Sequence, residues 1–415
     1  MDCFSAILAH QGRGLINAPA RMAYESPLGP DAGAYWVFST EECMDLIRKL
    51  NPPFRAEHIG SFVRPDNLLN AARQLKAGKI DHDELKRIAD AAIVEIVRFQ
   101  EDIGMPSVTD GEFRRRSWSA GFIDAVEGFG LREGTIEFRT QAAGKGAEFS
   151  PYAKARLQRT RGIATEEFAF LKSVVRKGTP KATIPAPDVM HYFLGPRAVD
   201  DSVYPDIEMY FDDLARIYRE EIAALAQLGC TYLQIDDTAL PCNCDEYIRK
   251  GVKKRGEDPD ALTARYIRLL NDAIRDRPAN MTIGVHMCRG NLKGTWMAEG
   301  GYDPIAEQLF NQATVDAFFL EFDTPRAGDF APLRHVPKTK TVVLGLVSSK
   351  TPVLEHADDI KRRINDAARY VDLDRLCLSP QCGFSSGGGS GQTVGLDDER
   401  RKLELVLDVV QDVWK

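Results

Sequence analysis

The sequence has few cysteines for its length and no long hydrophobic run. Eight cysteines are spread over 415 residues, far fewer than the disulfide scaffold of a small secreted protein contains. No apolar run reaches the roughly 18–20 residues that span a bilayer. The N-terminal segment lacks the basic stretch followed by an apolar stretch that marks a secretory signal. We therefore expect a cytoplasmic protein with no membrane partner, in which cysteines act as ligands, nucleophiles or core residues.

Positive charge is not in excess either. The chain has 54 Lys and Arg against 61 Asp and Glu, a net charge of −7, whereas nucleic-acid binders carry the basic residues that neutralise phosphates. The content of 44% hydrophobic and 28% charged residues is typical of globular proteins and excludes collagen, coiled coil and extensive disorder. We expect small-molecule partners and no nucleic acid, and the sequence leaves the oligomeric state open.

The N-terminal residues differ from the rest of the chain. Residues 1–52 are rich in Ala, Gly and Pro and have few periodic apolar positions, apart from one short helix expected over Ser39–Leu50. Two prolines, Pro52 and Pro53, end that helix. We expect residues 1–52 to form an appendage outside the core and residues 53–415 to form a single domain.

Short β-type runs alternate with amphipathic helical stretches from Pro53 onward. The 3.6-residue period is clearest over Ile207–Leu228, and Gly229 follows at the position of a C-terminal capping glycine. Eight strands separated by helices predict an α/β fold, a (β/α)8 TIM barrel. The rival open, doubly wound sheet begins with a glycine-rich turn that this sequence lacks. An insertion with elements of its own is expected at about residues 113–180, between the second and third strands. The predicted strands are Phe54–Gly60, Pro106–Asp110, Ala182–Pro187, Tyr232–Asp237, Thr282–Cys288, Ala317–Asp323, Thr341–Ser348 and Leu376–Cys382, and further helices are expected at Ile80–Ile103, Asp260–Arg275, Ala357–Tyr370 and Asp397–Val413.

Polar and ionisable residues gather where six of the eight predicted strands end, which is where barrel enzymes carry their chemistry. His286 and Cys288 are two residues apart on one strand and so face the same way. Glu321 ends the next strand, and Cys382 ends the last. Two thiolates, an imidazole and a carboxylate suit zinc, so we expect a zinc site at the C-terminal rim. Taken singly, each residue is better explained as an ordinary core position, and it is the occurrence of all four at strand ends of one rim that favours a metal.

The charge of such a site indicates its chemistry. Two thiolates, a carboxylate and Zn²⁺ sum to −1, which makes a poor Lewis acid toward water. An electron-rich zinc is better suited to hold a substrate thiol as a thiolate that stays nucleophilic. Glu321 would leave as that thiolate enters.

Six short motifs follow one another along the predicted barrel. They are Ile59-Gly60-Ser61-Phe62, Asp110-Gly111-Glu112, Gln234-Ile235-Asp236-Asp237, His286-Met287-Cys288, Leu320-Glu321 and Ser379-Pro380-Gln381-Cys382-Gly383. In this order and at these intervals the sequence resembles the cobalamin-independent methionine synthase family, over about Phe54 to Trp414. The resemblance is to the catalytic C-terminal barrel of that family and to its single-barrel relatives.

The resemblance implies roles for individual residues. It implies that the catalytic zinc is bound by His286, Cys288, Glu321 and Cys382. It also implies that Ile59 and Ser61 receive the carboxylate of homocysteine, and that Glu112 and Asp236 bind its ammonium group. Two carboxylates on separate strand ends suit a primary ammonium on chemical grounds too. One of Asp236 and Asp237 is expected to cap the following helix instead.

The sequence departs from the family in two ways. The classical synthase has a second barrel that helps to bind polyglutamylated folate, and this chain has one barrel. The family also has a histidine, a candidate proton donor, where this sequence has Val347. Protonation of a leaving group would then fall to Lys350 or to water, which leaves the methyl donor open.

We predict a zinc-dependent S-methyltransferase that methylates a thiol, homocysteine, to give methionine. Its catalytic residues would be Glu112, Asp236 and Lys350. The alternative within enzymes is a zinc-dependent transferase that uses another thiol or another electrophile such as an epoxide. The alternative from another class is a catalytically silent, zinc-bound binding protein.

Overall fold

The computed structural model describes residues 52–135, 149–291, 294–385 and 393–414. The elements described below all belong to the unit that begins at Pro53. The appendage predicted for residues 1–52, with its Ser39–Leu50 helix, falls outside the described residues except for Pro52.

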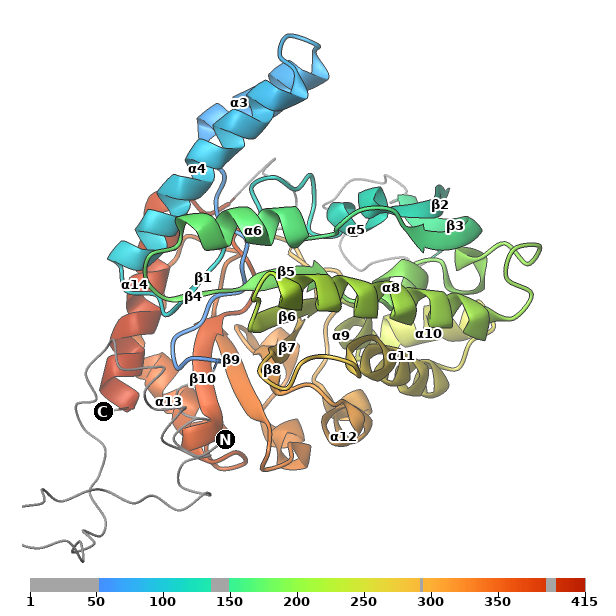
Figure 1. Cartoon of the computed structure of the whole chain (residues 1–415). Coiled ribbons are helices and arrows are strands. Elements are labelled where there is room, and N and C mark those ends of the chain that lie inside the picture. Colours follow the sequence, from blue (N-terminus) through green and yellow to red (C-terminus); the bar gives the residue numbers. More distant parts are fainter. Residues whose placement is uncertain (1–51, 136–148, 292–293, 386–392, 415) are drawn as a thin grey trace, which may run out of the picture. The chain divides into compact units, whose positions relative to one another are not determined.

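Six parallel strands form the central sheet, in the order β10-β9-β8-β7-β6-β5 (Figure 1). Helical segments connect successive strands, so the order in the sheet follows the order in the chain. The register pairs Asp236 with His286 and Met287 with Leu320. Because parallel strands end at one edge of a sheet, this register brings the residues at their carboxyl ends together. The strands are β5 (Ala182–Pro185), β6 (Tyr232–Asp237), β7 (Thr282–Met287), β8 (Ala317–Glu321), β9 (Thr341–Val347) and β10 (Leu376–Pro380).

The second predicted strand is shorter than the sequence indicates. Only β1 (Ser107–Val108) remains of it, and it pairs in parallel with β4 (Thr179–Pro180). The strand ends before Thr109 because the Gln100 side chain takes both backbone groups of that residue: Thr109 N donates to Gln100 Oε1 at 2.9 Å, and Thr109 O accepts from Gln100 Nε2 at 2.8 Å. Just beyond the predicted strand, Gly111 and Glu112 have positive φ values of +69° and +60°, which extended strands do not adopt.

The first predicted strand is present only as isolated bridges. Ala56 pairs with Leu378, and Ser61 pairs with Gly111, both in parallel. The backbone N–H of Phe54 is taken by a side chain, the Glu57 carboxylate, at 2.9 Å rather than by a neighbouring strand. The described pairings therefore give an α/β fold built on a six-stranded sheet, without one continuous ladder of eight strands.

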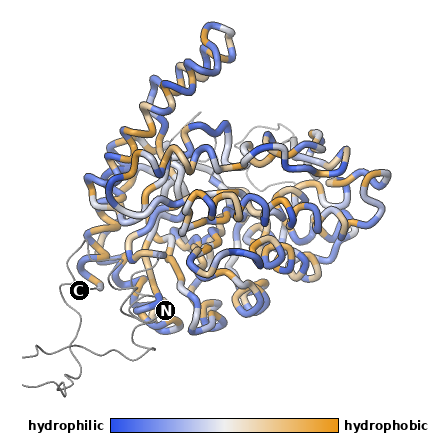
Figure 2. Tube along the Cα trace, viewed as in Figure 1, coloured by the Kyte–Doolittle hydropathy of each residue, from blue (hydrophilic) through white to orange (hydrophobic). Residues whose placement is uncertain are grey.

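The predicted helices are confirmed, with ends that shift by one to three residues. Aspartates cap three of them: Asp81 accepts from Glu84 N, Asp206 from Glu208 N and Asp258 from Ala261 N. In Figure 2 hydrophobic and hydrophilic residues alternate along the helices that cover the sheet. The helices of at least eight residues outside the insertion are α3 (Asp66–Lys76), α4 (His82–Asp102), α8 (Ile207–Gln227), α10 (Glu246–Lys254), α11 (Pro259–Ile274), α12 (Asp303–Gln312), α13 (Ala357–Ala367) and α14 (Leu396–Val413). The shorter ones are α7 (Val189–Tyr192), α9 (Ala239–Cys242) and the 3₁₀ turns η2 (Gly195–Ala198), η3 (Pro325–Ala327), η4 (Ala331–His335) and η5 (Leu373–Arg375).

The segment at about 113–180 carries elements of its own. Its two strands pair antiparallel, in contrast to the parallel central sheet. The elements are α5 (Ala120–Ala125), β2 (Val126–Glu133), β3 (Phe149–Arg159) and α6 (Thr165–Val174), followed by β4.

The strands of the central sheet are buried on both faces. One face joins the main core under the helices, while alternate residues on the other face form a smaller apolar cluster. Continuous burial of this kind is typical of parallel sheets. The smaller cluster consists of Ile59, Tyr232, Ala317, Phe319, Val343 and Cys377. None of the helices in the described part of the chain is both long enough and apolar enough to cross a membrane.

Candidate metal and substrate site

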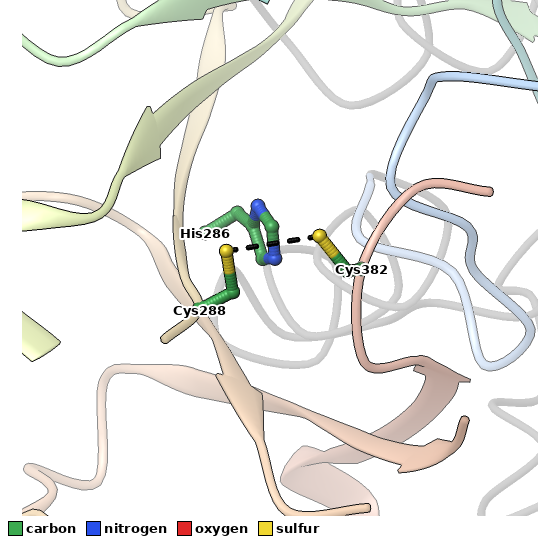
Figure 3. Close-up of side chains that lie close together, drawn as sticks. All are labelled: His286, Cys288 and Cys382. Carbon is green, nitrogen blue, oxygen red and sulfur yellow. Dashed lines mark hydrogen bonds between the residues drawn. The ribbon is translucent and has the colours of Figure 1, made fainter. Parts of the chain in front are cut away.

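Three nitrogen and sulfur donors converge beyond the ends of β7 and β10 (Figure 3). His286 lies in β7, Cys288 follows that strand directly, and Cys382 lies just after β10. One ligand atom from each residue lies within 4.8 Å of those of the other two, and the two Sγ atoms are 3.7 Å apart. All three side chains are buried. The structure thus brings together three of the four residues expected to bind zinc.

The chemistry of this group fits a divalent cation. Contact with Cys382, together with burial, raises the pKa of the Cys288 thiol well above its ordinary value. A cation supplies the charge that allows two adjacent buried thiols to ionise. His286 donates from Nδ1 to the Asp236 carboxylate at 3.0 Å, which is how a protein commonly fixes the ring of a metal-binding histidine. Its Nε2 lies 3.2 Å from the Gln381 carbonyl oxygen, a contact that a metal ion bound at Nε2 would replace. Two thiols and an imidazole held in this way suit zinc.

Glu321, the fourth expected ligand, lies outside this three-residue group. Its carboxylate accepts from the backbone N–H of Arg289, from the Arg326 guanidinium and from Lys350 Nζ, the last at 3.3 Å. Burial alone would raise the pKa of Glu321, but the positive charges of Lys350, Arg289 and Arg326 outweigh it and lower the pKa to about 2. Glu321 is therefore an ionised carboxylate, held by cations, at the end of the strand next to β7.

Lys350, the expected proton donor, belongs to the same cluster of charges. Its Nζ lies 3.3 Å from Glu321 and 3.8 Å from Asp323, and its side chain is buried. Val347 is also fully buried and packs in the main core, so at this position the protein has apolar packing in place of an acid. Lys350, which the sequence predicts as the proton donor, is thus already paired with the carboxylates of Glu321 and Asp323.

The two adjacent aspartates at the end of β6 have different tasks. Asp237 Oδ1 accepts from Ala239 N at 2.7 Å and from Leu240 N at 3.0 Å, and so caps α9. Asp236 Oδ1 accepts from Gln234 Nε2 at 2.7 Å and from His286. The expectation that one of the pair is a helix cap is confirmed, and Asp236 is the one that faces the metal group.

Glu112 lies near Asp236 in strained backbone. It is the only non-glycine among the described residues with a positive φ. Its Oε1 accepts from Thr183 Oγ1 at 2.9 Å and lies 3.5 Å from Arg115 Nη1. Burial raises the pKa of Glu112; Arg115 opposes this and Asp236 adds to it, for a value of about 7. The contribution of Asp236 indicates that its charge acts on the buried Glu112 carboxyl.

The segment Ile59–Ser61 lies against the loop that carries Cys382. Ser61 O accepts from Phe384 N at 2.9 Å. A Cβ on Gly383 would lie 1.9 Å from Ser61 Oγ, so only glycine allows this approach. The Ile59 side chain packs in the smaller apolar cluster, while its carbonyl accepts from Gln234. The expected carboxylate-binding segment and the metal group are therefore neighbours.

Sequence reasoning assigned no role to three polar side chains that contact the site. Gln234 stands two residues before Asp236 on the same face of β6, and this alternation is a signal that could have found it. Arg115 lies in the basic run Arg114–Arg116 and is buried between Glu167 and Glu112. Arg326 reaches Glu321 from the turn η3, a contact between loops for which a single sequence carries no signal.

A family model supports the resemblance seen in the sequence. The model of the cobalamin-independent synthase catalytic domain matches residues 54–397. The chain belongs to this family. Its relatives include the uncharacterized protein YxjH of Bacillus subtilis, which is 41% identical over 367 residues that cover 88% of this chain and 95% of that protein. A methionine synthase of Pyrococcus abyssi is 26% identical over 326 residues that cover 79% of this chain and 85% of that protein.

Solved structures agree with this assignment. A candidate vitamin-B12-independent methionine synthase of Listeria monocytogenes superposes with a TM-score of 0.68 at 32% identity, covering 88% of this chain and 99% of that one. A B12-independent methionine synthase of Shewanella sp. W3-18-1, in complex with selenomethionine, has a TM-score of 0.63 at 19% identity and covers 88% and 95%. The second match bears on the fold alone. The family membership predicted from the motifs is confirmed, and it groups this chain with methionine-synthase-like methyltransferases of α/β fold.

Proposed function

We propose that this protein is a zinc-dependent S-methyltransferase that converts homocysteine into methionine. The observation that carries the proposal is the convergence of His286, Cys288 and Cys382, with Asp236 behind the histidine ring. Relatives named methionine synthase add support. The methyl donor and substrate are small molecules in this proposal.

His286, Cys288 and Cys382 would hold the zinc, with Glu321 as the fourth ligand. Bound zinc would supply a site at which a substrate thiol ionises at neutral pH and stays nucleophilic. The Glu321 carboxylate also contacts Arg326 and Lys350. Glu321 would therefore be the ligand most easily replaced by a substrate thiol, because these two cations would stabilise its carboxylate away from the metal.

The remaining residues would orient the amino-acid end of the substrate. Glu112 and Asp236 would accept hydrogen bonds from the ammonium group, and the backbone of Ile59 and Ser61 would receive the carboxylate. All four residues are buried, so water is largely excluded and charge-assisted hydrogen bonds are strong there. Holding the sulfur at a fixed point in line with the donor's methyl group favours direct displacement.

Lys350 would supply the proton that the donor's leaving group requires. Its ammonium is buried between Glu321 and Asp323. Val347 has no ionisable group and cannot donate a proton. Because Val347 stands where the family has a histidine, the methyl donor is open. A second candidate function is one in which the thiol attacks a different electrophile, such as an epoxide, whose opened oxygen would take its proton from Lys350 or from water.

We also propose that the sheet closes into a (β/α)8 barrel. Parallel bridges from Ala56 to Leu378 and from Ser61 to Gly111, together with the pairing of β1 and β4, support closure. In this proposal residues 53–415 are one barrel with an insertion at about 113–180, residues 1–52 are an appendage, and the enzyme acts in the reducing cytoplasm. None of its six described cysteines forms a disulfide.

Metal analysis tests the ligands. We expect about one zinc per chain in purified protein and loss of that zinc in Cys288→Ser and in Cys382→Ser, because a hydroxyl is a poor ligand for zinc. Cys230→Ser is the matched control: Cys230 is equally buried but lies outside the cluster, where its Sγ donates to Tyr232 O. It should keep its zinc. Full zinc retention in both ligand variants would remove His286, Cys288 and Cys382 as the metal site.

Product analysis tests the reaction. Zinc-loaded protein is incubated with L-homocysteine and, in turn, methyl folates, methylcobamide, S-methylmethionine and an epoxide, and products are identified by mass spectrometry. Methionine formation supports the methyltransferase, and a thioether formed from the epoxide supports the second function. Protein that binds zinc but forms no product with any donor, and whose cobalt-substituted spectrum is unchanged by homocysteine, would be a silent binding protein.

A further inference from the structure

A complete ionic network lies beneath the proposed substrate site. Lys181, between β4 and β5, and Glu57 form an ion pair at 3.2 Å, and both side chains are fully buried. The Lys181 ammonium has three donors, which go to Glu57 Oε2, to His58 O and to Gln234 Oε1, the last at 3.2 Å. Glu57 also accepts from Tyr232 Oη at 2.7 Å. Every donor of the lysine is therefore paired, so its geometry is fixed in all directions.

This network determines which way the Gln234 amide points. Lysine carries only donors, so the amide oxygen must face Lys181. The amide nitrogen then faces two acceptors, Ile59 O at 2.5 Å and Asp236 Oδ1 at 2.7 Å. If the amide were flipped, its NH₂ group would face the Lys181 ammonium, and its oxygen would face the oxygens of Ile59 and Asp236. Neither arrangement forms a hydrogen bond. The Lys181–Glu57 ion pair thus determines that Gln234 donates, rather than accepts, in its contacts with Ile59 and Asp236.

Gln234 touches both parts of the proposed amino-acid recognition site. Asp236 would bind the ammonium group and the Ile59–Ser61 backbone would bind the carboxylate, and one amide group holds the two at a set separation. Asp236 Oδ1 is committed to Gln234 and His286. Oδ2 accepts no hydrogen bond within the described part of the chain, so it is the oxygen free to accept from a ligand.

We propose that Gln234, oriented by Lys181, is a positioning residue that sets the Asp236 carboxylate for the ammonium group of the thiol substrate. This inference rests on the proposed function, because it assumes that Asp236 recognises an ammonium group. Gln234 touches no substrate atom in the proposal and acts through Asp236. A buried ion pair contributes little net stability, and here its effect is to fix one orientation of a neighbouring amide.

The test compares two thiols that differ only in the amino group. Binding of L-homocysteine and of 4-mercaptobutanoate to zinc-loaded protein is measured by titration calorimetry. Gln234→Glu keeps the acceptor for Lys181 but loses both donors, and Gln234→Met removes all three hydrogen bonds at similar volume. We expect each variant to weaken homocysteine binding by about tenfold, the effect of roughly one charge-assisted hydrogen bond. Affinity for 4-mercaptobutanoate should change by less than about twofold, because that ligand makes no use of Asp236. The backbone that would bind its carboxylate stays held without Gln234, by Thr109 Oγ1 at Gly60 O and by Phe384 N at Ser61 O.

A double-mutant cycle and a control variant separate positioning from general damage. In an Asp236→Asn background, Gln234→Met should weaken homocysteine binding by less than about twofold further. Gln100 is the control, because its amide is equally buried and makes three hydrogen bonds, to Ile96 and Thr109, but none to Asp236. Gln100→Met should retain the wild-type preference for homocysteine.

The outcomes distinguish this inference from the function on which it rests. Equal losses for both thiols in the Gln234 variants, or a full additional loss in the Asp236→Asn background, overturn the positioning role and leave the proposed function standing. A wild-type protein that binds homocysteine no better than 4-mercaptobutanoate overturns ammonium recognition by Asp236, and the positioning role falls with it.

Discussion

Glu112 has an uncommon backbone conformation at the proposed substrate site. It adopts φ +60°, a region that costs a non-glycine residue on the order of 1 kcal/mol or more. Its carboxyl is buried, and the charges of Arg115 and Asp236 act on it. Burial and the repulsion from Asp236 both favour its protonated form. A ligand that brings its own positive charge removes that repulsion.

The pKa of Glu112 makes substrate binding depend on pH. The value of about 7 means that Glu112 is mostly protonated below pH 7 and must lose its proton to pair with an ammonium group. The affinity for homocysteine relative to 4-mercaptobutanoate should therefore rise by up to about tenfold per pH unit up to pH 7 and then level off. Taking the ratio removes the ionisation of the thiol, which both ligands share.

Glu112→Gln is the variant that checks this cause. It cannot titrate, so the affinity ratio should be flat between pH 6 and pH 8 and should lie below the wild-type plateau, since one charge partner is gone. A wild-type ratio that is flat over the same range, or a Gln variant that keeps the slope, would assign the pH dependence to another group.

The sequence revealed those site residues whose geometry follows from strand periodicity. His286 and Cys288 share a face because they are two residues apart, and Cys382 follows another strand end of the same sheet. Glu321 was found in the same way, but its contacts with Arg326 and Lys350 were not. Those contacts depend on how the turns after β8 and β9 fold over the rim, and that is set by tertiary packing.

At the scale of elements, one glycine of β9 allows the neighbouring strands β8 and β10 to approach closely where they end near the metal group. Gly345 lies between Glu321 of β8 and Ser379 of β10. A Cβ there would lie 2.7 Å from the Gln381 Cα and 2.9 Å from the Leu320 carbonyl oxygen. Both are backbone atoms, which cannot rotate away as a side chain can.

Gly345→Ala should therefore push β8 and β10 apart. We expect a loss of about 1–3 kcal/mol in the free energy of unfolding, as for other overpacked sites, and weaker zinc retention because Gln381 precedes Cys382. Gly251→Ala is the control: Gly251 lies within α10 with open space around it. That change should stabilise by roughly 0.5–1 kcal/mol. Urea unfolding measures both, and a neutral Gly345→Ala would mean that the strands yield easily.

Helices and inner strands were predictable, and the first two strands were less so. The helices begin at aspartate caps such as Asp81 and Asp206 that are visible in the sequence. The first predicted strand is not hydrogen-bonded to a neighbouring strand at Phe54, because the Glu57 side chain accepts from the Phe54 N–H. The second is cut short where the Gln100 side chain takes the backbone N–H and C=O of Thr109, and strained backbone follows at Gly111 and Glu112. Side-chain competition for backbone donors and strained turns are tertiary and functional effects that hydrophobic alternation does not encode.

At the scale of the whole unit, the three proposed metal ligands come from strands that are not neighbours in the sheet. His286 lies in β7, Cys288 directly follows β7 and Cys382 follows β10, while β8 and β9 lie between those strands. A cation bound to all three residues therefore restrains segments 94 residues apart. Binding that requires the folded state stabilises that state by mass action. The proposed zinc should then act on the unfolding of the entire unit and not only on the rim.

Thermal unfolding of metal-free and zinc-loaded protein measures this coupling. Free zinc at about a thousandfold above its dissociation constant adds about 4 kcal/mol, so the midpoint of the loaded protein should exceed that of chelator-treated protein by at least about 5 °C at a fixed scan rate. Cys288→Ser should show no response to added zinc, and Cys230→Ser should respond like the wild type. Equal midpoints with and without zinc in the wild type would mean that the cation does not bridge β7 and β10, and that the three donors meet for a reason other than metal binding.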